Sequence, residues 1–351
     1  MSRRPLSAAS LCVVLCLFLS VARAQAPEPD SAPAATSAPA SAFADLPIRD
    51  EAPVVVTGVQ PGPGMWKVSK DGRTLWVLGT LSPLPAKMEW VSRDVEAVIA
   101  QADEVIWSPS LVFDADIGFF RGLLLMPRAL KARRNPDGRT LREVLPADLY
   151  ARWLPLKRKH LGRDEGVEQW RPLFAAMKLY EEALEDSGLR QGGVVGPVLM
   201  RAIKAHEVRQ TRPEVRVVIE DPKAALDEFR GTSLDDMACF EQTLRRVEAD
   251  LDRMRLRANA WATGDLATLR ALPYEDQNES CVRATLQTDA VRKRVQRDLE
   301  AEMRTRWLEA AEKALAGNGV TFAVLPMRDL LRPDGLLATL QARGYTVEAP
   351  E

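Results

Sequence analysis

The sequence predicts an α+β fold, in which a mixed sheet is built from N- and C-terminal strand segments around a large helical middle block. Strand-like runs occur at 65–78 and 104–107, and again at 321–325 and 345–347. Between about 140 and 316, apolar residues recur mostly at the three- and four-residue spacing of helices. One further strand is expected at 215–219, which is rich in β-branched residues.

The first strands are predicted from a hairpin signal. The apolar segments 65–68 and 75–78 flank Asp71-Gly72, a dipeptide typical of two-residue hairpin turns. The second segment then runs, as a buried strand, into a glycine turn at Gly79 and on to Ser82. A helix is predicted over 91–102, because its apolar residues share one face, and the strand at 104–107 follows.

The remaining elements are placed by periodicity and by glycine stop signals. A middle helix is expected from the apolar and aromatic residues at 173, 177, 180 and 184. Ser233 is the predicted N-cap of a single helix that runs to about 263 and ends before Gly264. Another long helix should cover about 290–316 and stop at Gly317, and a short one over 335–342 should be capped by Gly344.

The N-terminus has the features of a secretory signal. Residues 1–24 contain Arg3 and Arg4, an apolar run over 11–21, and small residues before a predicted cleavage after Ala24. A membrane anchor is the alternative, but the run is too short for a comfortable span. The protein is therefore expected to be secreted, into the periplasm, with no transmembrane segment after cleavage. The Ala/Pro/Ser-rich segment 25–63 is a predicted flexible linker, and 64–351 is the predicted folded domain.

Charge argues against nucleic acid as a partner. The chain has 48 basic and 49 acidic residues, and the first 24 residues hold three arginines and no acid, which leaves 45 against 49. A mildly acidic protein has no general attraction for nucleic acid or anionic lipid. The basic runs at 131–134 and 157–160 could bind a polyanion, but solvated helix faces are the preferred interpretation.

Two cysteines, Cys239 and Cys281, lie outside the predicted signal. In an oxidising compartment a lone pair is expected to form a disulfide. Zinc is a poor alternative because neither His160 nor His206 is near a cysteine in sequence. Four tryptophans in the N-terminal part could line an aromatic cleft for a sugar or peptide, but a core role is the preferred interpretation; they are Trp66, Trp76, Trp90 and Trp107.

Four sequence patches, taken in order, resemble a known family. They are 66–68 with 75–80 and 84–85; 102–106; 260–266 with Leu269; and 322–325 with 333–337 and 342–347. Together they resemble the TraB/GumN family, which is grouped with TIKI-like and erythromycin-esterase-like hydrolases, and the likeness covers about 65–348. The resemblance implies that family's α+β fold.

The resemblance also implies where an active site would lie. Such families are expected to use two GxxH motifs, a glutamate that ends the second strand, and an arginine on the last long helix. Two imidazoles and a carboxylate suit a divalent metal, and an arginine can stabilise oxyanion charge. Gly79 is kept, but serines replace the first histidine and the glutamate, a methionine replaces the arginine, and an aspartate replaces the second histidine; they are Ser82, Ser108, Met303 and Asp329.

The neighbour of Met303 does not restore the missing arginine. Arg304 is one position away and should point about 100° round the helix. The expected protein is therefore a family member with a degenerate active site, which has no cofactor and serves a binding or scaffolding role in the cell envelope. The resemblance suggests a peptide or a cell-surface polysaccharide as ligand.

Two alternatives remain. One is a metal-dependent hydrolase, peptidase- or esterase-like, with a site rebuilt around Ser82, Ser108 and Asp329 and a divalent metal. A Ser82 nucleophile would need a base, and both histidines are expected at the surface. Asp329 is expected to pair with Arg328 or Arg332, since a lone carboxylate is a weak metal ligand. The other alternative is a structural partner subunit that uses its long helices.

Overall fold

The computed structural model describes residues 62–115, 117–231, 236–272, 281 and 298–350. A compact unit covers Gln60–Glu351. The predicted signal at 1–24, the predicted linker as far as 61, the Ser233 cap and the start of the helix expected from 290 all lie outside the described residues.

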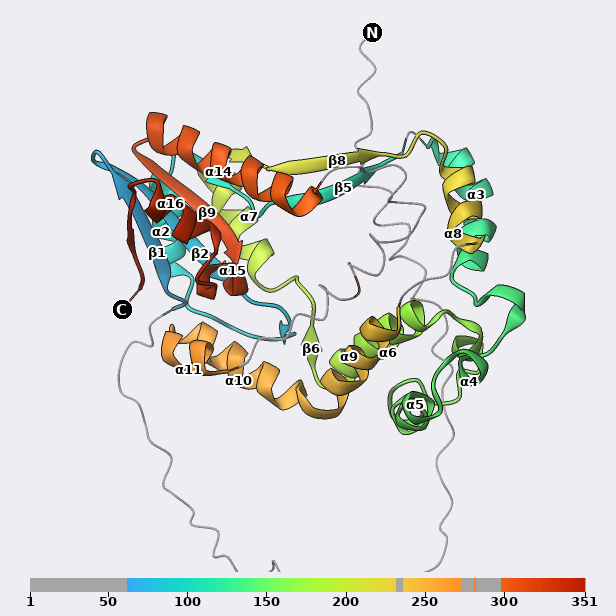
Figure 1. Ribbon diagram of the computed structural model, residues 1–351. Helices are drawn as coiled ribbons and strands as arrows, with labels where there is room; N and C mark the ends of the chain where they lie inside the picture. Colours follow the sequence, from blue (N-terminus) through green and yellow to red (C-terminus); the bar gives the residue numbers. More distant parts are fainter. Residues whose placement is uncertain (1–61, 116, 232–235, 273–280, 282–297, 351) are drawn as a thin grey trace, which may run out of the picture. The chain divides into compact units, whose positions relative to one another are not determined.

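This unit contains a six-stranded mixed sheet in the order β10-β1-β2-β9-β4-β7, three strands of which, β1, β2 and β9, are labelled in Figure 1. Antiparallel pairs join β1 to β10 and to β2, and parallel pairs join β2 to β9, β9 to β4, and β4 to β7. The C-terminal strand β9 therefore lies between the N-terminal strands β2 and β4 and pairs with both. This arrangement confirms the predicted mixed sheet. The strands are β1 Met65–Lys70, β2 Arg73–Thr80, β4 Glu104–Ile106, β7 Arg209–Thr211, β9 Val320–Pro326 and β10 Thr346–Glu348.

The first hairpin forms where the turn residues predict it. Lys70 pairs with Arg73, so Asp71 and Gly72 are the two loop residues. Both have positive φ, 51° and 77°. This conformation suits a tight hairpin, because its twist matches that of the flanking strands.

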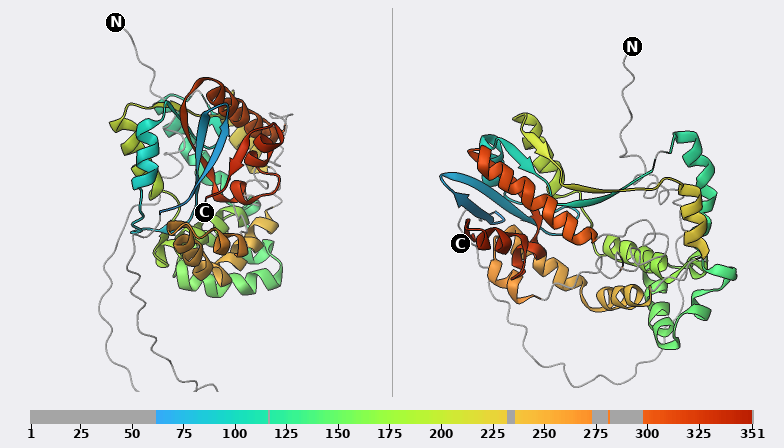
Figure 2. Two further views of the ribbon diagram at one scale, coloured as in Figure 1. Left: turned by 90° about the vertical axis from the view of Figure 1, so that its left-hand side faces the viewer. Right: turned by 45° about the horizontal axis from the view of Figure 1, so that its top comes forward.

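Helices cover both faces of the sheet. Figure 2 shows α2 and α7 on one side of the strands and α14 with α16 on the other. The core between these layers contains fully buried Leu75, Ile106, Trp307 and Phe322. The helices are α2 Arg93–Gln101, α7 Val195–Ala205, α14 Leu299–Gly317 and α16 Leu336–Ala342.

The middle block is mostly helical, as predicted, and has an apolar cluster of its own. Trp153 and Phe240 pack at its centre with ring centroids 5.5 Å apart. Met177 is 53% exposed, since it lies at the edge of the buried stripe of α6. The elements are η2 Pro136–Gly138, α4 Leu141–Val144, α5 Ala147–His160, η3 Gly166–Gln169, α6 Pro172–Asp186, α9 Met237–Ala249, α10 Leu251–Ala262 and α11 Leu266–Ala271.

The predicted single helix before Gly264 is in fact two helices, α9 and α10, that meet at Asp250. The backbone there departs from ideal helical angles, with φ −113° and ψ −7°. The Asp250 carboxylate accepts a 2.6 Å hydrogen bond from Arg257 and lies 3.6 Å from Arg246. Because both arginines are buried, they need this partner. The pairing stabilises the bend, and helical periodicity cannot reveal it.

A disulfide joins Cys239 of α9 to Cys281, the pairing expected from the sequence. Cys239 is fully buried and packs with Leu173 of α6. The bond therefore fixes Cys281 to the middle block.

A two-stranded parallel ribbon, β5 Ser110–Asp114 with β8 Glu214–Val218, was not fully predicted. It leads away from the main sheet to a packed pair of helices, α3 Phe119–Ala132 and α8 Pro222–Gly231 (Figures 1 and 2). A smaller pair of strands joins β3 Leu84–Pro85 to β6 Leu189–Arg190. No helix in the described ranges is long and apolar enough to cross a bilayer.

Candidate functional site

The carboxyl ends of the parallel strands β2, β9 and β4 bring several predicted site positions together. Gly79 of β2 pairs with Leu325 of β9. Ser108, just after β4, donates its hydroxyl proton to the carbonyl of Val324 at 2.9 Å. Asp329 follows in the short helix α15 Met327–Leu331, which begins where β9 ends. We call this group, with its neighbouring arginines, the strand-end site.

Gly79 allows close packing at this edge. It lies within β2 and not in the predicted turn. A Cβ atom at this position would come within 2.6 Å of the Met327 methyl carbon and 2.9 Å of Leu330. Its carbonyl accepts a 2.6 Å hydrogen bond from the buried indole of Trp261 in α10. Glycine is therefore needed at position 79 for α15 to pack closely against β2. Trp261 also binds this residue, through its backbone carbonyl.

Two predicted positions have different surroundings. Ser82 is exposed on the loop after β2, where it precedes the cis proline Pro83. Met303 of α14 packs on the apolar cluster formed by Val215, Val217 and Leu299. The methionine that replaces the expected arginine is thus a packing residue beneath the β5–β8 ribbon.

Arg304 of α14 approaches the strand-end site, while its neighbour Met303 packs elsewhere. Its guanidinium donates to the carbonyl oxygen of Asp334 at 2.8 Å. Its charge also acts on the Asp329 carboxyl. The two neighbouring residues of α14 therefore have different partners.

Asp329 is a partly buried carboxylate among arginines. Its Oδ1 lies 3.6 Å from Nε of Arg328, as expected from the sequence. Burial raises the pKa of Asp329, and this effect outweighs the opposing charges of Arg328, Arg332 and Arg304, while Glu300 adds to the rise. Among the described residues, burial is therefore the dominant influence on the Asp329 carboxyl, and it disfavours the ionised form.

Neither histidine lies at the strand-end site, and one prediction about them is wrong. His206 is exposed at the end of α7, as expected. His160 is buried at the end of α5, where its Nδ1 lies 2.8 Å from Asp186 Oδ2. The partner comes from α6, 26 residues away, so the local sequence gave no sign of it. No imidazole is placed to act as base for Ser108.

The basic runs are also not simple solvated faces. Lys157 is buried, and its Nζ lies 3.1 Å from Glu168 and 3.3 Å from Glu165. The guanidinium of Arg133 lies over the ring of Trp170, 4.1 Å from its centroid. These cations therefore stabilise the middle block. Glu165 and Glu168 follow α5 closely in sequence, so they could have indicated the pairing with Lys157.

The four N-terminal tryptophans do not form an open aromatic cleft. Trp66 is buried, and the other three are partly buried against the core. Trp90 packs on Trp261 at 5.4 Å. Trp107, at the end of β4, lies under the guanidinium of Arg212 at 4.8 Å. The preferred core interpretation is confirmed.

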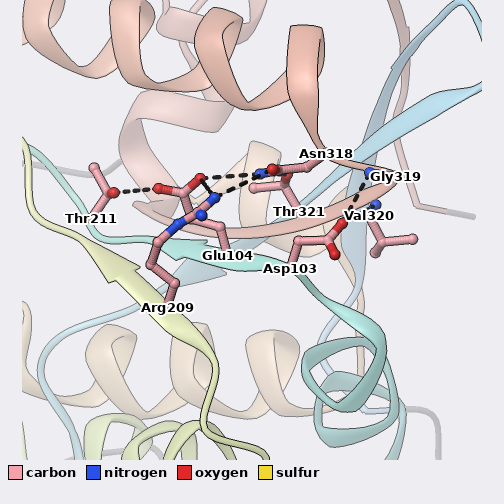
Figure 3. Close-up of polar contacts among 8 residues, drawn as sticks. All are labelled: Asp103, Glu104, Arg209, Thr211, Asn318, Gly319, Val320 and Thr321. Carbon is pink, nitrogen blue, oxygen red and sulfur yellow. Dashed lines mark hydrogen bonds and ion pairs between the residues drawn. The ribbon is translucent and has the colours of Figure 1, made fainter.

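The opposite ends of the same strands carry a polar network that the sequence did not indicate (Figure 3). Glu104, the first residue of β4, accepts hydrogen bonds from Thr211, Arg209 (3.0 Å) and Asn318 (3.0 Å). Beside it, Asp103 accepts from the backbone N–H groups of two residues at the start of β9, Gly319 and Val320. The network joins β4 to β7 and to the turn between α14 and β9, which is a structural role.

Replacing Glu104 should destabilise the protein at neutral pH. Burial tends to raise the pKa of Glu104, but hydrogen bonds from Thr211, Asn318 and Arg209 outweigh it and hold that pKa below its ordinary value. A lowered folded pKa means that the ionised form stabilises the fold above the unfolded pKa, and that this stability is lost as pH falls through the folded pKa. We expect Glu104→Gln to lower the free energy of unfolding by about 1–3 kcal/mol at pH 7.

Denaturant unfolding at several pH values tests this expectation. The difference between Glu104→Gln and wild type should shrink on acidification, because both side chains are then uncharged. Glu89→Gln is the matched control, since Glu89 is exposed. A difference that stayed constant from pH 7 into acid would show that the charge of Glu104 plays no part.

The TraB/PrgY/gumN family profile matches residues 64–349, almost the whole described unit. The chain belongs to this family. No curated protein and no solved structure matches it. The family match agrees with the α+β fold. The chemistry of this TraB/PrgY/gumN member depends on its own residues.

The donor set of the strand-end site does not fit the divalent metal that the family resemblance implied. One carboxylate, Asp329, lies 3.6 Å from Arg328 and is also acted on by the charges of Arg332 and Arg304, and the Ser108 hydroxyl donates a hydrogen bond to a strand carbonyl. Divalent cations prefer several carboxylates or imidazoles, not a carboxylate among arginines. Within the described part of the chain, no group of three or more His, Cys, Asp or Glu side chains could hold a metal ion.

Proposed function

We propose that this TraB/PrgY/gumN family protein is a non-catalytic member that serves a binding role in the cell envelope. The observation that carries the proposal is the state of Asp329. This residue stands where the resemblance expects a metal-binding histidine, and it pairs with Arg328 at 3.6 Å with two further arginines acting on it. A carboxylate that is already surrounded by arginine charges is better suited to a binding site than to activating water.

The serines give further support. The Ser108 hydroxyl donates a hydrogen bond to the carbonyl of Val324, so its proton points at this carbonyl and not at a base. His160 is engaged with Asp186 in the middle block, and His206 lies at the end of α7. A serine hydrolase would need a base within hydrogen-bond reach of its nucleophile, and the placement of the histidines argues against one at the strand-end site.

The ligand class follows from the groups around this edge. Arginine guanidinium groups recognise carboxylates, and Arg328, Arg332 and Arg304 lie around this edge. These features suit a peptide or an acidic cell-surface polysaccharide. The proposal includes export to an oxidising compartment, the periplasm, which the Cys239–Cys281 disulfide supports because such bonds persist there.

Metal content and the stability of an Asp329 variant test the proposal. We expect the purified protein to contain no stoichiometric zinc, manganese or cobalt, and its thermal midpoint to be unchanged by a chelator. Because the folded pKa of Asp329 is raised, ionisation above that pKa costs stability. Asp329→Asn should therefore raise the thermal midpoint slightly at pH 7 and leave it unchanged in acid.

Asp334→Asn provides a control of opposite sign. Hydrogen bonds from Arg332 lower the pKa of Asp334, so removing its charge should not stabilise the protein. A stoichiometric metal that is lost in Asp329→Asn, together with a fall in the thermal midpoint of that variant, would instead establish the rebuilt metallohydrolase.

A further inference from the structure

Helix α3 presents an apolar face to solvent. In the described part of the chain, nine large apolar side chains are exposed, and four of them lie on this one helix: Phe120 (79%), Leu123 (53%), Leu124 (73%) and Leu130 (40%). Residues three and four positions apart share a face of a helix, so these side chains form one stripe along α3. Such a concentration marks an interaction surface more than scattered single leucines would.

The opposite side of α3 faces the protein. Leu125 and Ala132 are buried, and the helix packs against α8 at the end of the β5–β8 ribbon (Figures 1 and 2). The exposed stripe is therefore a second apolar face of α3, distinct from the side that carries the buried Leu125 and Ala132.

The charged residues of α3 are all basic. The 14 residues of α3 include Arg121, Arg128 and Lys131 and no acid. Arg128 is 4.0 Å from Asp227 of α8, a long contact. Arg121 and Lys131 form no ion pair with a described residue and are exposed. Lysine and arginine can extend their charged ends away from an apolar layer while their stems remain in it.

We propose that α3 binds the surface of a bilayer that contains anionic phospholipid, with its apolar stripe in the interface and its cations at the headgroups. Phenylalanine and leucine on one face, bordered by lysine and arginine, are the composition of helices that lie in a membrane interface. At ~1.5 Å per residue, α3 is about 21 Å long, shorter than the ~30 Å hydrocarbon layer, so it lies along the surface and does not span.

Charge favours a lipid surface over a second copy of the chain. A two-fold dimer would place the same patch of each copy face to face. Three cations of one α3 would then meet three of the other, without any acid on either helix. An anionic bilayer can accommodate both the apolar side chains and the cations of α3. A second copy of the chain could cover the apolar side chains but would bring cations together.

Vesicle flotation of the full chain tests the proposal. We expect binding to vesicles of phosphatidylglycerol and phosphatidylcholine in equal parts, and much weaker binding to phosphatidylcholine alone. Leu123→Ser with Leu124→Ser should weaken binding by at least about tenfold, because each leucine loses its apolar contact. The matched control is Met177→Ser with Leu256→Ser, which removes two exposed apolar side chains elsewhere and should bind as wild type does.

A charge variant gives a second test that does not depend on the apolar stripe. Arg121→Glu with Lys131→Glu should weaken binding to the anionic vesicles by about tenfold or more, and added salt should reduce wild-type binding. Lys159→Glu with Arg201→Glu, two exposed cations on α5 and α7, is its control.

Three outcomes would overturn the proposal. One is no binding of the full chain to anionic vesicles. Another is equal binding by wild type and both α3 variants. The third is sedimentation showing a wild-type oligomer that Leu123→Ser with Leu124→Ser dissociates, which would assign the stripe to a second copy. None of these results bears on the strand-end site, which lies on other elements.

Discussion

Reduction of the Cys239–Cys281 disulfide should lower the free energy of unfolding by about 4 kcal/mol. The two residues are 42 positions apart, and closing a loop of that length removes conformational entropy from the unfolded chain by roughly this amount. The bond is also the link that fixes Cys281 to the buried Cys239 of α9.

Denaturant unfolding of the oxidised and reduced wild-type protein measures this contribution with both sulfur atoms still present. Cys239→Ala with Cys281→Ala should match the reduced protein, apart from a small loss from the buried position of Cys239. Thiol titration of the unreduced protein without residues 1–24, under denaturing conditions, should find Cys239 and Cys281 blocked. Two reactive thiols, or equal stability of the oxidised and reduced forms, would contradict the prediction.

Trp261→Ala should cost about 3–5 kcal/mol of stability, the range for removing a large aromatic side chain from a core. The indole of Trp261 is fully buried, packs on Trp90 at 5.4 Å and donates to the Gly79 carbonyl at 2.6 Å. Its removal would leave a cavity beneath β2 and a buried carbonyl without its donor. Both losses fall at the edge of the sheet that carries the strand-end site.

Two variants separate the components of this effect. Trp261→Phe keeps most of the volume and removes the N–H donor, so it should cost about 1–3 kcal/mol. Trp107→Ala, at a partly buried tryptophan under Arg212, should cost less than Trp261→Ala. If Trp261→Ala unfolded at the same denaturant concentration as wild type, the indole would not be part of the core.

Local signals made much of the fold predictable. Asp71-Gly72 specified the hairpin because both residues adopt positive φ, and Gly264 and Gly344 follow helices and also have positive φ. Strand β9 was recognisable as an unbroken apolar run, and its burial on nearly every residue explains why. These features depend on neighbours in sequence, where periodicity and turn chemistry apply.

The features that were missed depend on residues far apart in the chain. His160 is buried because Asp186 lies beside it, and the bend at Asp250 is held by the buried Arg257. The reach of Arg304 toward Asp329 depends on how α14 lies on the sheet. Sequence spacing gives the direction in which a side chain leaves its helix but not the partner it meets.

The position of β9 has a consequence for biosynthesis. This strand separates β2 from β4 in the sheet, yet it is made after both of them and after the whole middle block. A growing polypeptide therefore carries the hairpin β1–β2 with an open edge until residue 326 is available to pair with it. Unpaired strand edges invite aggregation, so a premature stop codon between the end of β2 and β9 should yield insoluble fragments.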